Sequence, residues 1–388
     1  MDSKNIEALK LHEEHKGKLS IESVVPLKNK YDLSLAYTPG VAAPCIEITN
    51  NPESVYQYTM KSRLVAIITD GSAVLGLGNI GPLAAIPVME GKAALLKTFA
   101  NVDGFPICLD TQDPDEIVDT IIKIAPVFGA IMLEDIAAPK CVDIERRLQA
   151  KLTIPVCHDD QHGTAMVVAA AIINASRLLN KPLTSMRIVV SGTGAAGSAI
   201  CRLLKAIGVK TIHAYNKQGI MSIKKYNDYD VVLKGLLNEN IIDSYDDYQV
   251  DDLASLIKGA DGFIGVSAGG ILTETMVKSM NSDPIVLAMA NPIPEIMPDL
   301  AIKAKAAIVG TGRSDFPNQI NNVLVFPGLF KGALQARLKS IDLQTKIRVA
   351  YALAHLILEE DLRSDYILPD IFDKRVVPTI VEAVVKPK

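Results

Sequence analysis

The sequence predicts an α/β protein of two domains: a first domain of βα units and a second, Rossmann-like domain with a doubly wound sheet. Short apolar runs that end in polar or acidic residues alternate with helical patterns through the first half of the chain. Near the middle, a β-rich run leads into a G-x-G-x-x-G loop and an apolar helix, which is the pattern of a doubly wound sheet. A chain of 388 residues that is 49% hydrophobic has enough apolar material for two cores.

Composition and charge exclude several classes of protein. Lys plus Arg number 40 against 44 Asp plus Glu, a net charge of −4 without a basic run, so nucleic acid is not an expected partner. No apolar stretch reaches the ~20 residues of a membrane helix, and the N-terminus lacks the apolar core of a signal peptide. The five cysteines are scattered and never spaced as C-x-x-C, which favours a reducing compartment. We therefore expect a cytoplasmic protein without membrane contacts.

The first domain is expected over residues 1–163. Its predicted strands are apolar and end beside polar or acidic residues; they cover residues 64–68, 105–109, 130–133 and 154–157. Helical patterns lie between them, at residues 89–99, 114–124 and 139–151. This alternation predicts a parallel sheet covered on both faces. Because ligands bind beyond the carboxyl ends of such strands, the site of this domain is expected among the acids that follow them.

The second domain is expected over residues 164–321, after the start of an apolar helix at residues 163–179. Its predicted strands cover residues 187–190, 211–215, 262–266, 285–288 and 306–309. Residues 322–388 are expected to form a C-terminal helical segment that packs back on the first domain. Apolar side chains recur there with helical spacing, as at Ile347, Ala350, Leu353 and Ile357.

Two loops share the spacing G-x-G-x-x-G. In Gly192-Thr193-Gly194-Ala195-Ala196-Gly197, a predicted strand precedes the loop and an apolar helix follows it. Its glycines can bring the backbone close to a pyrophosphate at the helix N-terminus, so we expect a dinucleotide there; the alternative is a purely structural turn. After the loop of residues 76–81, Pro82 follows at once and Pro87 is expected to interrupt an immediate helix. This second loop is expected to shape a substrate pocket or a turn.

The acid that usually binds the ribose of NAD is absent. It is expected about 20 residues beyond the loop, at the end of the next strand, where this chain has Asn216 and Lys217. Asn216 can bind a hydroxyl without repelling a phosphate, and Lys217 can neutralise one, unless it is simply a solvated surface lysine. The pattern therefore favours NADP at least as much as NAD.

Three carboxylates follow two predicted strands that can be neighbours: Glu134, Asp135 and Asp160. Such all-oxygen ligands suit Mg²⁺ or Mn²⁺, although acids in these positions also cap the helices that follow. His158 and His162 flank the acids and invite a zinc interpretation. Surface or hydrogen-bonding roles are expected for both histidines instead.

A lysine and a tyrosine are candidates for proton transfer. Lys92 is expected near the start of an apolar helix, where the helix dipole disfavours a cation and lowers its pKa. A lysine with a lowered pKa suits a general base, but most lysines are only solvated surface groups. Tyr37 lies in a predicted turn and, by itself, indicates packing.

Several short segments, spread in order along nearly the whole chain, match one family of enzymes. They are residues 37–42 (Y-T-P-G-V-A), 69–82 (T-D-G-S-A-V-L-G-L-G-N-I-G-P), 90–92 (E-G-K), 133–135 (L-E-D), 158–164 (H-D-D-Q-H-G-T), the Gly192 loop, 290–292 (A-N-P), and 312–315 (G-R-S-D) through 321–322 (N-N) to 326–328 (F-P-G). Together they resemble the malic enzyme family, of the short bacterial-type subunit. An ordered set of this kind is far more specific than any single motif.

The resemblance implies a role for each candidate residue. Glu134, Asp135 and Asp160 would bind Mg²⁺ or Mn²⁺, Lys92 would be the general base with support from Asp159, Tyr37 would be the general acid, and Asn291 and Asn322 would hold malate. We assign Ser267 and Asn291 to the dinucleotide site as well. One departure is that larger members grip a carboxylate with an arginine in the glycine-rich substrate loop, where this chain has Ser72. The other departure is Asn216 in place of the ribose acid.

The expected activity is oxidative decarboxylation of (S)-malate to pyruvate and CO₂ with reduction of NAD or NADP, dependent on a divalent metal. Alternatives are a redox-neutral malolactic reaction, a dinucleotide-binding regulator without activity, and an amino-acid dehydrogenase, which would not need three acids around a metal. The resemblance further implies a homodimer. It leaves open whether Tyr37 or Lys92 serves its own subunit or the neighbour.

Overall fold

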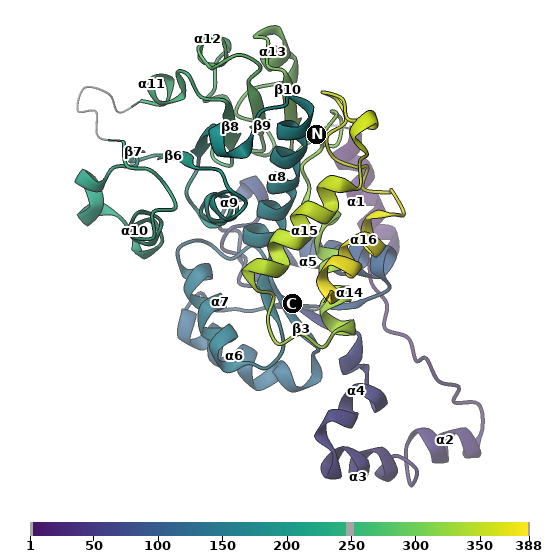
Figure 1. Cartoon of the computed structure of the whole chain (residues 1–388). Coiled ribbons are helices and arrows are strands. Elements are labelled where there is room, and N and C mark those ends of the chain that lie inside the picture. The colour runs from purple at the N-terminus through teal and green to yellow at the C-terminus, as the bar shows by residue number, and fades with distance from the viewer. Residues whose placement is uncertain (1–2, 246–251, 387–388) are drawn as a thin grey trace.

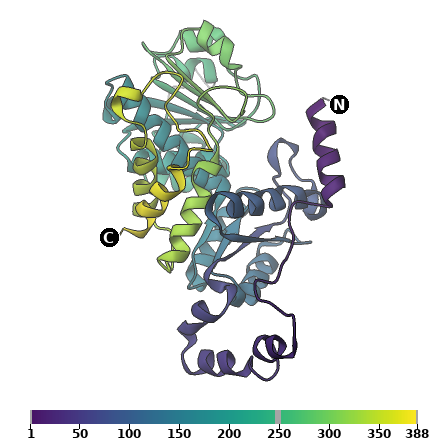
Figure 2. The ribbon, with the colours of Figure 1, turned by 90° about the vertical axis from the view of Figure 1, so that its right-hand side faces the viewer.

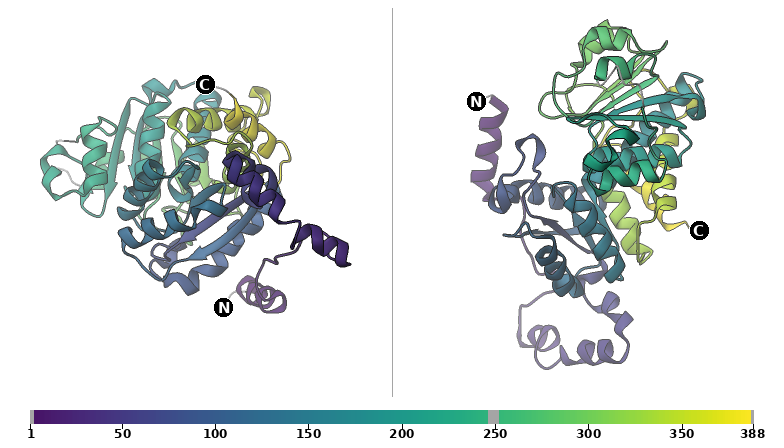
Figure 3. Two further views of the ribbon diagram at one scale, coloured as in Figure 1. Left: turned by 90° about the horizontal axis from the view of Figure 1, so that it is seen from below. Right: turned by 90° about the vertical axis from the view of Figure 1, so that its left-hand side faces the viewer.

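The computed structural model describes residues 3–245 and 252–386. They form two α/β bodies, each built on its own sheet, and Figure 3 shows the two sheets as separate units. The fold class predicted from the sequence is therefore confirmed. Among the described residues, no helix combines the length and the apolar character that crossing a membrane requires.

The first sheet has the parallel order β2-β1-β3-β4. Its strands are β1 (Leu64–Thr69), β2 (Asp103–Cys108), β3 (Ala130–Leu133) and β4 (Val156–His158). All residues of β1, β3 and β4 are buried, because helices cover both faces of the sheet. Val65 and Ile67 of β1 pack with α5 (Gly81–Ala100) in one core, whereas Ala66 and Ile68 pack with α6 (Pro114–Ile124) and α7 (Lys140–Lys151) in another.

The second sheet has six strands in the order β10-β9-β8-β5-β6-β7. They are β5 (Arg187–Ser191), β6 (Thr211–Asn216), β7 (Gly219–Ile220), β8 (Gly262–Gly265), β9 (Ile285–Ala288) and β10 (Ile308–Thr311). All pairs are parallel except β6 with β7. Helices α9 (Ala195–Ala206), α10 (Val231–Asn238), α11 (Leu253–Ile257), α12 (Glu274–Lys278) and α13 (Pro298–Lys303) connect the strands. The chain reverses direction across the sheet between β5 and β8, where doubly wound sheets bind ligands.

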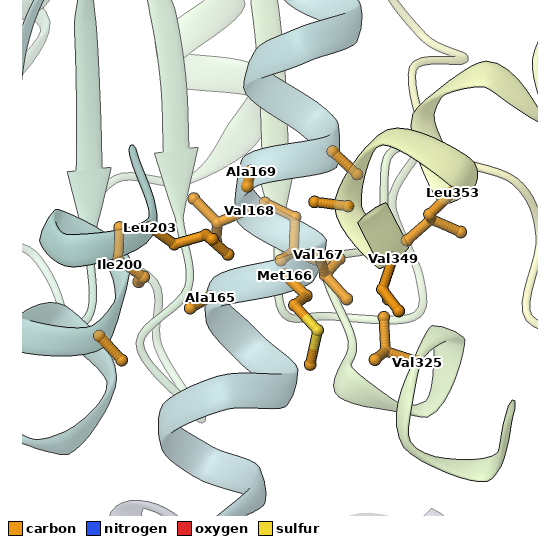
Figure 4. Close-up of a cluster of buried hydrophobic side chains, with 14 of the residues drawn as sticks. Ala165, Met166, Val167, Val168, Ala169, Ile200, Leu203, Val325, Val349 and Leu353 are labelled. Atoms are coloured by element: carbon orange, nitrogen blue, oxygen red, sulfur yellow. The ribbon is translucent and has the colours of Figure 1, made fainter. Parts of the chain in front are cut away.

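Helix α8 (Asp159–Leu178) lies between the two bodies. It begins directly after β4 and packs against α9 and α15 (Leu343–His355). Figure 4 shows its residues Ala165 to Ala169 between Ile200 and Leu203 of α9 on one side and Val349 and Leu353 of α15 on the other. The domain boundary expected at residue 163 therefore falls within the first turns of a helix that both bodies share.

The C-terminal helices contact both bodies. Helix α14 (Phe326–Gln335) packs on α5, on β3 and on α16 (Val376–Val385), and α15 packs on α8 and α16. Gly328 and Gly332 of α14 permit close approach to α16, since an added Cβ would lie 2.6 Å from Ile380 and 2.7 Å from Val384. These contacts bring the segment that follows β10 close to the carboxyl edge of the first sheet.

The N-terminal segment protrudes from the rest of the molecule. It comprises α1 (Ser3–His15), α2 (Lys30–Ala36), α3 (Ala42–Asn50) and α4 (Val55–Tyr58). Helices α2 and α3 contain no buried residue and stand apart from both sheets in Figures 1 and 2.

The predicted start of one helix is wrong, and several strands differ by one or two residues from their predicted bounds. Helix α5 begins at Gly81 instead of residue 89, with Pro82 in its first turn and Pro87 inside it. Pro82 lies where no intrahelical donor is needed, and Pro87 leaves only the carbonyl of the exposed Leu83 without its helical partner. Strand β7 is also absent from the prediction, because two residues do not form a recognisable apolar run.

Candidate active site

The three acids expected to bind a metal lie together. Glu134 and Asp135 directly follow β3, and Asp160 lies in the first turn of α8, directly after β4. Since β3 and β4 are parallel neighbours, with Leu133 beside His158, their carboxyl ends place the acids at one edge of the sheet. One ligand oxygen from each residue lies within 4.8 Å of the others. The Asp135 N–H also donates to Asp160 Oδ2 at 2.9 Å.

Two oxygens of this cluster are buried without a hydrogen-bond donor in the described part of the chain: Glu134 Oε2 and Asp135 Oδ2. Burial and the charge of Asp160 raise the pKa of Glu134 well above its ordinary value and that of Asp135 to about 7, although Lys92 opposes both shifts. Buried oxygens that lack donors and repel one another are what a hard divalent cation would satisfy. The three acids therefore fit Mg²⁺ or Mn²⁺.

Lys92 lies beside the acids. Its Nζ is 2.5 Å from Asp159 Oδ2, 2.8 Å from Glu134 Oε1 and 3.3 Å from Asn322 Oδ1, and it lies 4.6 Å from the centre of the Phe326 ring. Burial acts to lower the pKa of Lys92, but the charges of Asp159 and Glu134 together outweigh it and raise that pKa.

The expectation of a lowered pKa for Lys92 is therefore wrong. Because α5 begins at Gly81, Lys92 lies about three turns into the helix, where the dipole at the N-terminus has little effect. The neighbouring carboxylates dominate instead.

Asp159 and Asn322 complete the surroundings of Lys92. Asp159, the first residue of α8, is buried, and a Cβ at position 163 would lie 2.1 Å from its Oδ1, so Gly163 leaves room for the carboxylate. Burial raises the pKa of Asp159, with Lys92 opposing the shift. Asn322 begins a short 3₁₀ turn that leads into α14.

The structure places Asn291 in the loop after β9. An added Cβ on Gly76 would lie 2.2 Å from the Asn291 carbonyl oxygen, and one on Gly312 would lie 2.9 Å from its amide nitrogen. The second glycine loop of the first body therefore touches the Asn291 loop of the second, so the two bodies meet at their sites.

Tyr37 lies apart from this cluster. It directly follows α2 in the protruding N-terminal segment, and it is 66% exposed. Within one chain, the structure does not bring Tyr37 to Lys92.

Ser72 is held by protein groups, because its hydroxyl donates to Asp70 Oδ1 and accepts the N–H of Ala137.

The Gly192 loop lines a cavity of about 710 Å³ between the two bodies. Of the residues expected to bind a dinucleotide, the following line it: Gly192, Thr193, Gly194, Asn216, Lys217 and Ser267. Ala195, Ala196 and Gly197 form the first turn of α9. Ala138 and Pro139 of the first body also line the cavity, as does Asp230. Sequence reasoning missed all three, since no local pattern marks them.

Asn216 is already held by protein groups. Its Nδ2 donates to Thr193 Oγ1 at 2.8 Å, and its Oδ1 accepts the N–H of Gln218 at 2.7 Å. The amide thus ties the end of β6 to the glycine loop, while Lys217 is exposed.

Neither histidine near the acids lies on the surface. His162 has the expected hydrogen-bonding role, with Nε2 2.9 Å from Glu145 Oε2 and Nδ1 3.0 Å from Lys346 Nζ. His158 is fully buried, and its ring nitrogens have no hydrogen-bond partner among the described residues. Of the two roles expected for these histidines, hydrogen bonding is therefore confirmed for His162, whereas His158 has neither a surface position nor a hydrogen bond among the described residues.

Glu145 of α7, which sequence reasoning missed, holds the turn between β4 and α8. Its Oε1 accepts the N–H of His158 at 2.9 Å, and its Oε2 faces His162. Burial acts to raise the pKa of Glu145, but His162, Lys346 and these hydrogen bonds lower it to about 2. The buried carboxylate thus fixes the turn that carries Asp159 and Asp160.

Comparisons with known proteins agree with this arrangement. A family model of the malic enzyme N-terminal domain matches residues 16–149, and one of the malic enzyme NAD-binding domain matches residues 161–387. A bifunctional malic/malolactic enzyme of Bacillus subtilis is 52% identical over 380 residues, covering 98% of this chain and 92% of the relative. An NAD-dependent malic enzyme of Geobacillus stearothermophilus is 49% identical, covering 95% of this chain and 76% of the relative.

More distant relatives include longer proteins and solved structures. An NADP-dependent malic enzyme of Escherichia coli is 43% identical, and the match covers 95% of this chain but 50% of that longer protein. The crystal structure of an NAD-dependent malic enzyme from Thermotoga maritima has a TM-score of 0.92 and 43% identity, covering 97% of this chain and 98% of the other.

Proposed function

The chain belongs to the malic enzyme family, and we propose that it converts (S)-malate to pyruvate and CO₂ with reduction of NAD or NADP. One observation carries the proposal. A buried lysine, Lys92, contacts Asp159 and Glu134 beside a three-acid cluster that fits a divalent cation. This cluster lies where the first body meets the body that carries the Gly192 loop. In this proposal, the proton-transfer group, the metal site and the dinucleotide site would act on one small substrate.

Glu134, Asp135 and Asp160 are the residues that would hold Mg²⁺ or Mn²⁺. When bound, such a cation supplies a Lewis acid for the C2 oxygen and a counter-charge for the three acids, and the dinucleotide supplies a hydride acceptor. The residues of the chain provide the rest of the chemistry.

The charges of Glu134 and Asp160, which help to raise the pKa of Lys92, would be offset by the bound cation. In its neutral form, Lys92 would then accept the proton of the C2 hydroxyl at Nζ as malate is oxidised. Asp159, which touches Lys92 at 2.5 Å, would position the amine without contacting substrate. Asn322, 3.3 Å from Lys92 Nζ, and Asn291 would hold malate between the two bodies. Loss of the C4 carboxylate then leaves enolpyruvate, which needs a proton at C3.

Tyr37 would supply that proton, and we propose that it does so in the site of a partner subunit. Its helix protrudes, and apolar side chains next to it are exposed, including Tyr31, Leu33 and Leu35. Covering them in a homodimer would bring a tyrosine to a site that it does not reach in one chain.

Mixing two inactive variants tests this arrangement. If Tyr37 acts across the dimer, a Lys92→Ala chain paired with a Tyr37→Phe chain contains one intact site. Random exchange of subunits should then restore about a quarter of the wild-type rate of pyruvate formation from malate. If Tyr37 acts within its own chain, mixing restores nothing.

Partial reactions test the roles of the two residues. Lys92→Ala should abolish malate oxidation, since general acid–base catalysis contributes about 10²- to 10⁴-fold. Tyr37→Phe should depress pyruvate formation but still reduce added oxaloacetate. Full malate oxidation by Lys92→Ala would contradict the assignment.

The choice of cofactor and the location of the protein complete the proposal. Asn216 and Lys217 favour NADP at least as much as NAD, and the relatives include enzymes named for each. All five cysteines are free, in keeping with the cytoplasmic location expected from the sequence.

A further inference from the structure

Glu295 is a fully buried carboxylate in the loop between β9 and α13. Its Oε1 accepts the N–H of Ser267 at 2.8 Å and the Ser267 hydroxyl at 3.3 Å, and its Oε2 accepts the N–H of Ala290 at 3.0 Å. The strand beneath leaves room for it, because an added Cβ on Gly265 would lie 2.4 Å from the Glu295 carboxyl carbon.

These hydrogen bonds join the ends of three neighbouring strands. Ser267 follows β8, and its hydroxyl lies 3.0 Å from that of Ser191 at the end of β5. Ala290 follows β9. In the sheet order, β5, β8 and β9 are adjacent, so one carboxylate links their carboxyl ends.

The groups that Glu295 holds belong to the dinucleotide cavity and to the loop of the proposed substrate pocket. Ser267 lines the cavity of the Gly192 loop. Ala290 precedes Asn291, whose carbonyl approaches Gly76 of the first body. Glu295 itself does not line the dinucleotide cavity, so it acts on the site through the residues that it holds.

Burying a carboxylate to hold a loop in place costs free energy of folding. Burial raises the pKa of Glu295, and no ion pair involves it within the described residues. Well-packed apolar groups often stabilise a fold as well or better. Two N–H groups that both point at one carboxylate, however, set the separation of their loops in a way that apolar packing does not.

We propose that Glu295 is a positioning residue that fixes the Ser267 loop of the dinucleotide cavity relative to Asn291 of the substrate pocket. In this role, which rests on the proposed function, it holds the nicotinamide and malate at the separation that hydride transfer requires. A displacement of about 1 Å at such a site can cost about 10²-fold in rate.

Glu295→Gln tests the proposal against a matched control. Glutamine keeps the shape but has one acceptor oxygen, so either Ser267 or Ala290 loses its partner. The control is Asp261→Asn, which also removes a buried carboxylate from the same sheet. Asp261 accepts the N–H of Arg187 at 2.8 Å and pairs with Lys181 at 2.9 Å, at the amino edge of the sheet and away from the site.

Both variants should lower the melting temperature. Only Glu295→Gln should reduce kcat at saturating malate and dinucleotide, by about tenfold or more, and weaken binding of reduced dinucleotide measured by its fluorescence. Glu295→Asp keeps the charge and shortens the reach, so it should fold and show a smaller loss of the same kind.

A kcat and a dinucleotide affinity in Glu295→Gln that match those of Asp261→Asn would overturn the proposal. If Glu295→Gln does not fold, wild-type kinetics in Glu295→Asp would overturn it as well. A wild-type protein without malate turnover would contradict the proposed function instead. In that case, the fluorescence titration would still test whether Glu295 orders the dinucleotide cavity.

Discussion

The two loops with the spacing G-x-G-x-x-G have different surroundings. In the Gly192 loop, Gly192 has a φ of +98°, and an added Cβ on Gly197 would lie 1.8 Å from the Gly192 carbonyl oxygen. Gly194 has only the Ala138 side chain at 4.0 Å. One glycine thus makes the turn, one packs the helix on the strand, and one leaves open backbone facing the cavity, as a pyrophosphate requires.

In the other loop, one of the three glycines lies at the contact between the two bodies. Gly76 is confined by the Asn291 carbonyl of the second body, whereas Gly78 and Gly81, with φ of +75° and +78°, face open space. A helix follows each loop, but Pro82 removes an N–H donor from the first turn of α5. Spacing alone therefore predicts a tight turn, and the contacts around each glycine distinguish an anion-binding loop from one that closes over a substrate.

The largest expected effect distinguishes the metal site from the dinucleotide site. Asp135→Asn removes one charge from the metal cluster while keeping its shape. Affinity for Mn²⁺, measured by calorimetry, should fall by about two orders of magnitude, since ligand charge tunes affinity over decades. Dinucleotide affinity should not change. Unaltered Mn²⁺ affinity would contradict the assignment of the three acids.

Gly197→Ala tests the close packing of the Gly192 loop. The added methyl group collides with backbone, and such overpacking costs about 1–3 kcal/mol. If the loop shifts to make room for the methyl group, dinucleotide affinity should fall roughly 10- to 100-fold in a fluorescence titration. Affinity for Mn²⁺ should be unchanged. An affinity equal to that of the wild type would show that the loop is only a structural turn.

Glu145→Gln tests whether Glu145 positions the turn that carries Asp159 and Asp160. Residues behind metal ligands commonly contribute about 10- to 100-fold in metal affinity, so Mn²⁺ binding should weaken by about tenfold. The pKa of Glu145 is lowered to about 2, so its contribution to stability is present above the ordinary value near 4.5 and is lost as the pH falls toward 2.

The stability difference between wild type and Glu145→Gln should therefore shrink by about 1–2 kcal/mol between pH 5.5 and 3.5. Urea unfolding at the two pH values measures it. A difference that stays constant over this range would mean that Glu145 is not held ionised by its partners.

The smallest expected effect is that of Gly78→Ala. The position is open but has a positive φ, so the cost should be about 1 kcal/mol of stability. Thermal unfolding should show a small decrease, and dinucleotide affinity should be unchanged. Loss of dinucleotide binding in this variant would remove the distinction between the two loops.

The sequence predicted the parts of the fold that depend on burial. Strands β3 and β9 have the predicted bounds, because fully buried parallel strands are continuous apolar runs. The start of α5 was missed because Pro87 was expected to break it, whereas the helix continues through Pro87 and loses the hydrogen bond to the carbonyl of the exposed Leu83.

The site residues that directly follow strands were predicted from the sequence. The buried acids that lie in a helix or in a loop were missed. Glu134, Asp135 and Asp160 follow strand ends, so topology brings them together. Glu145 lies in an amphipathic helix, where an acid is indistinguishable in sequence from a solvated one, and Glu295 lies in a loop. The position of Tyr37 depends on tertiary structure that no local pattern encodes.

The most direct test of the central claim is the absorbance of reduced nicotinamide with purified protein, malate and Mn²⁺, run in parallel with NAD and NADP and followed by assay of the products. We expect net reduction of the dinucleotide with an equal amount of pyruvate. Lactate without net reduction would indicate a malolactic reaction, and no turnover would indicate a binding protein; either result would contradict the proposed function.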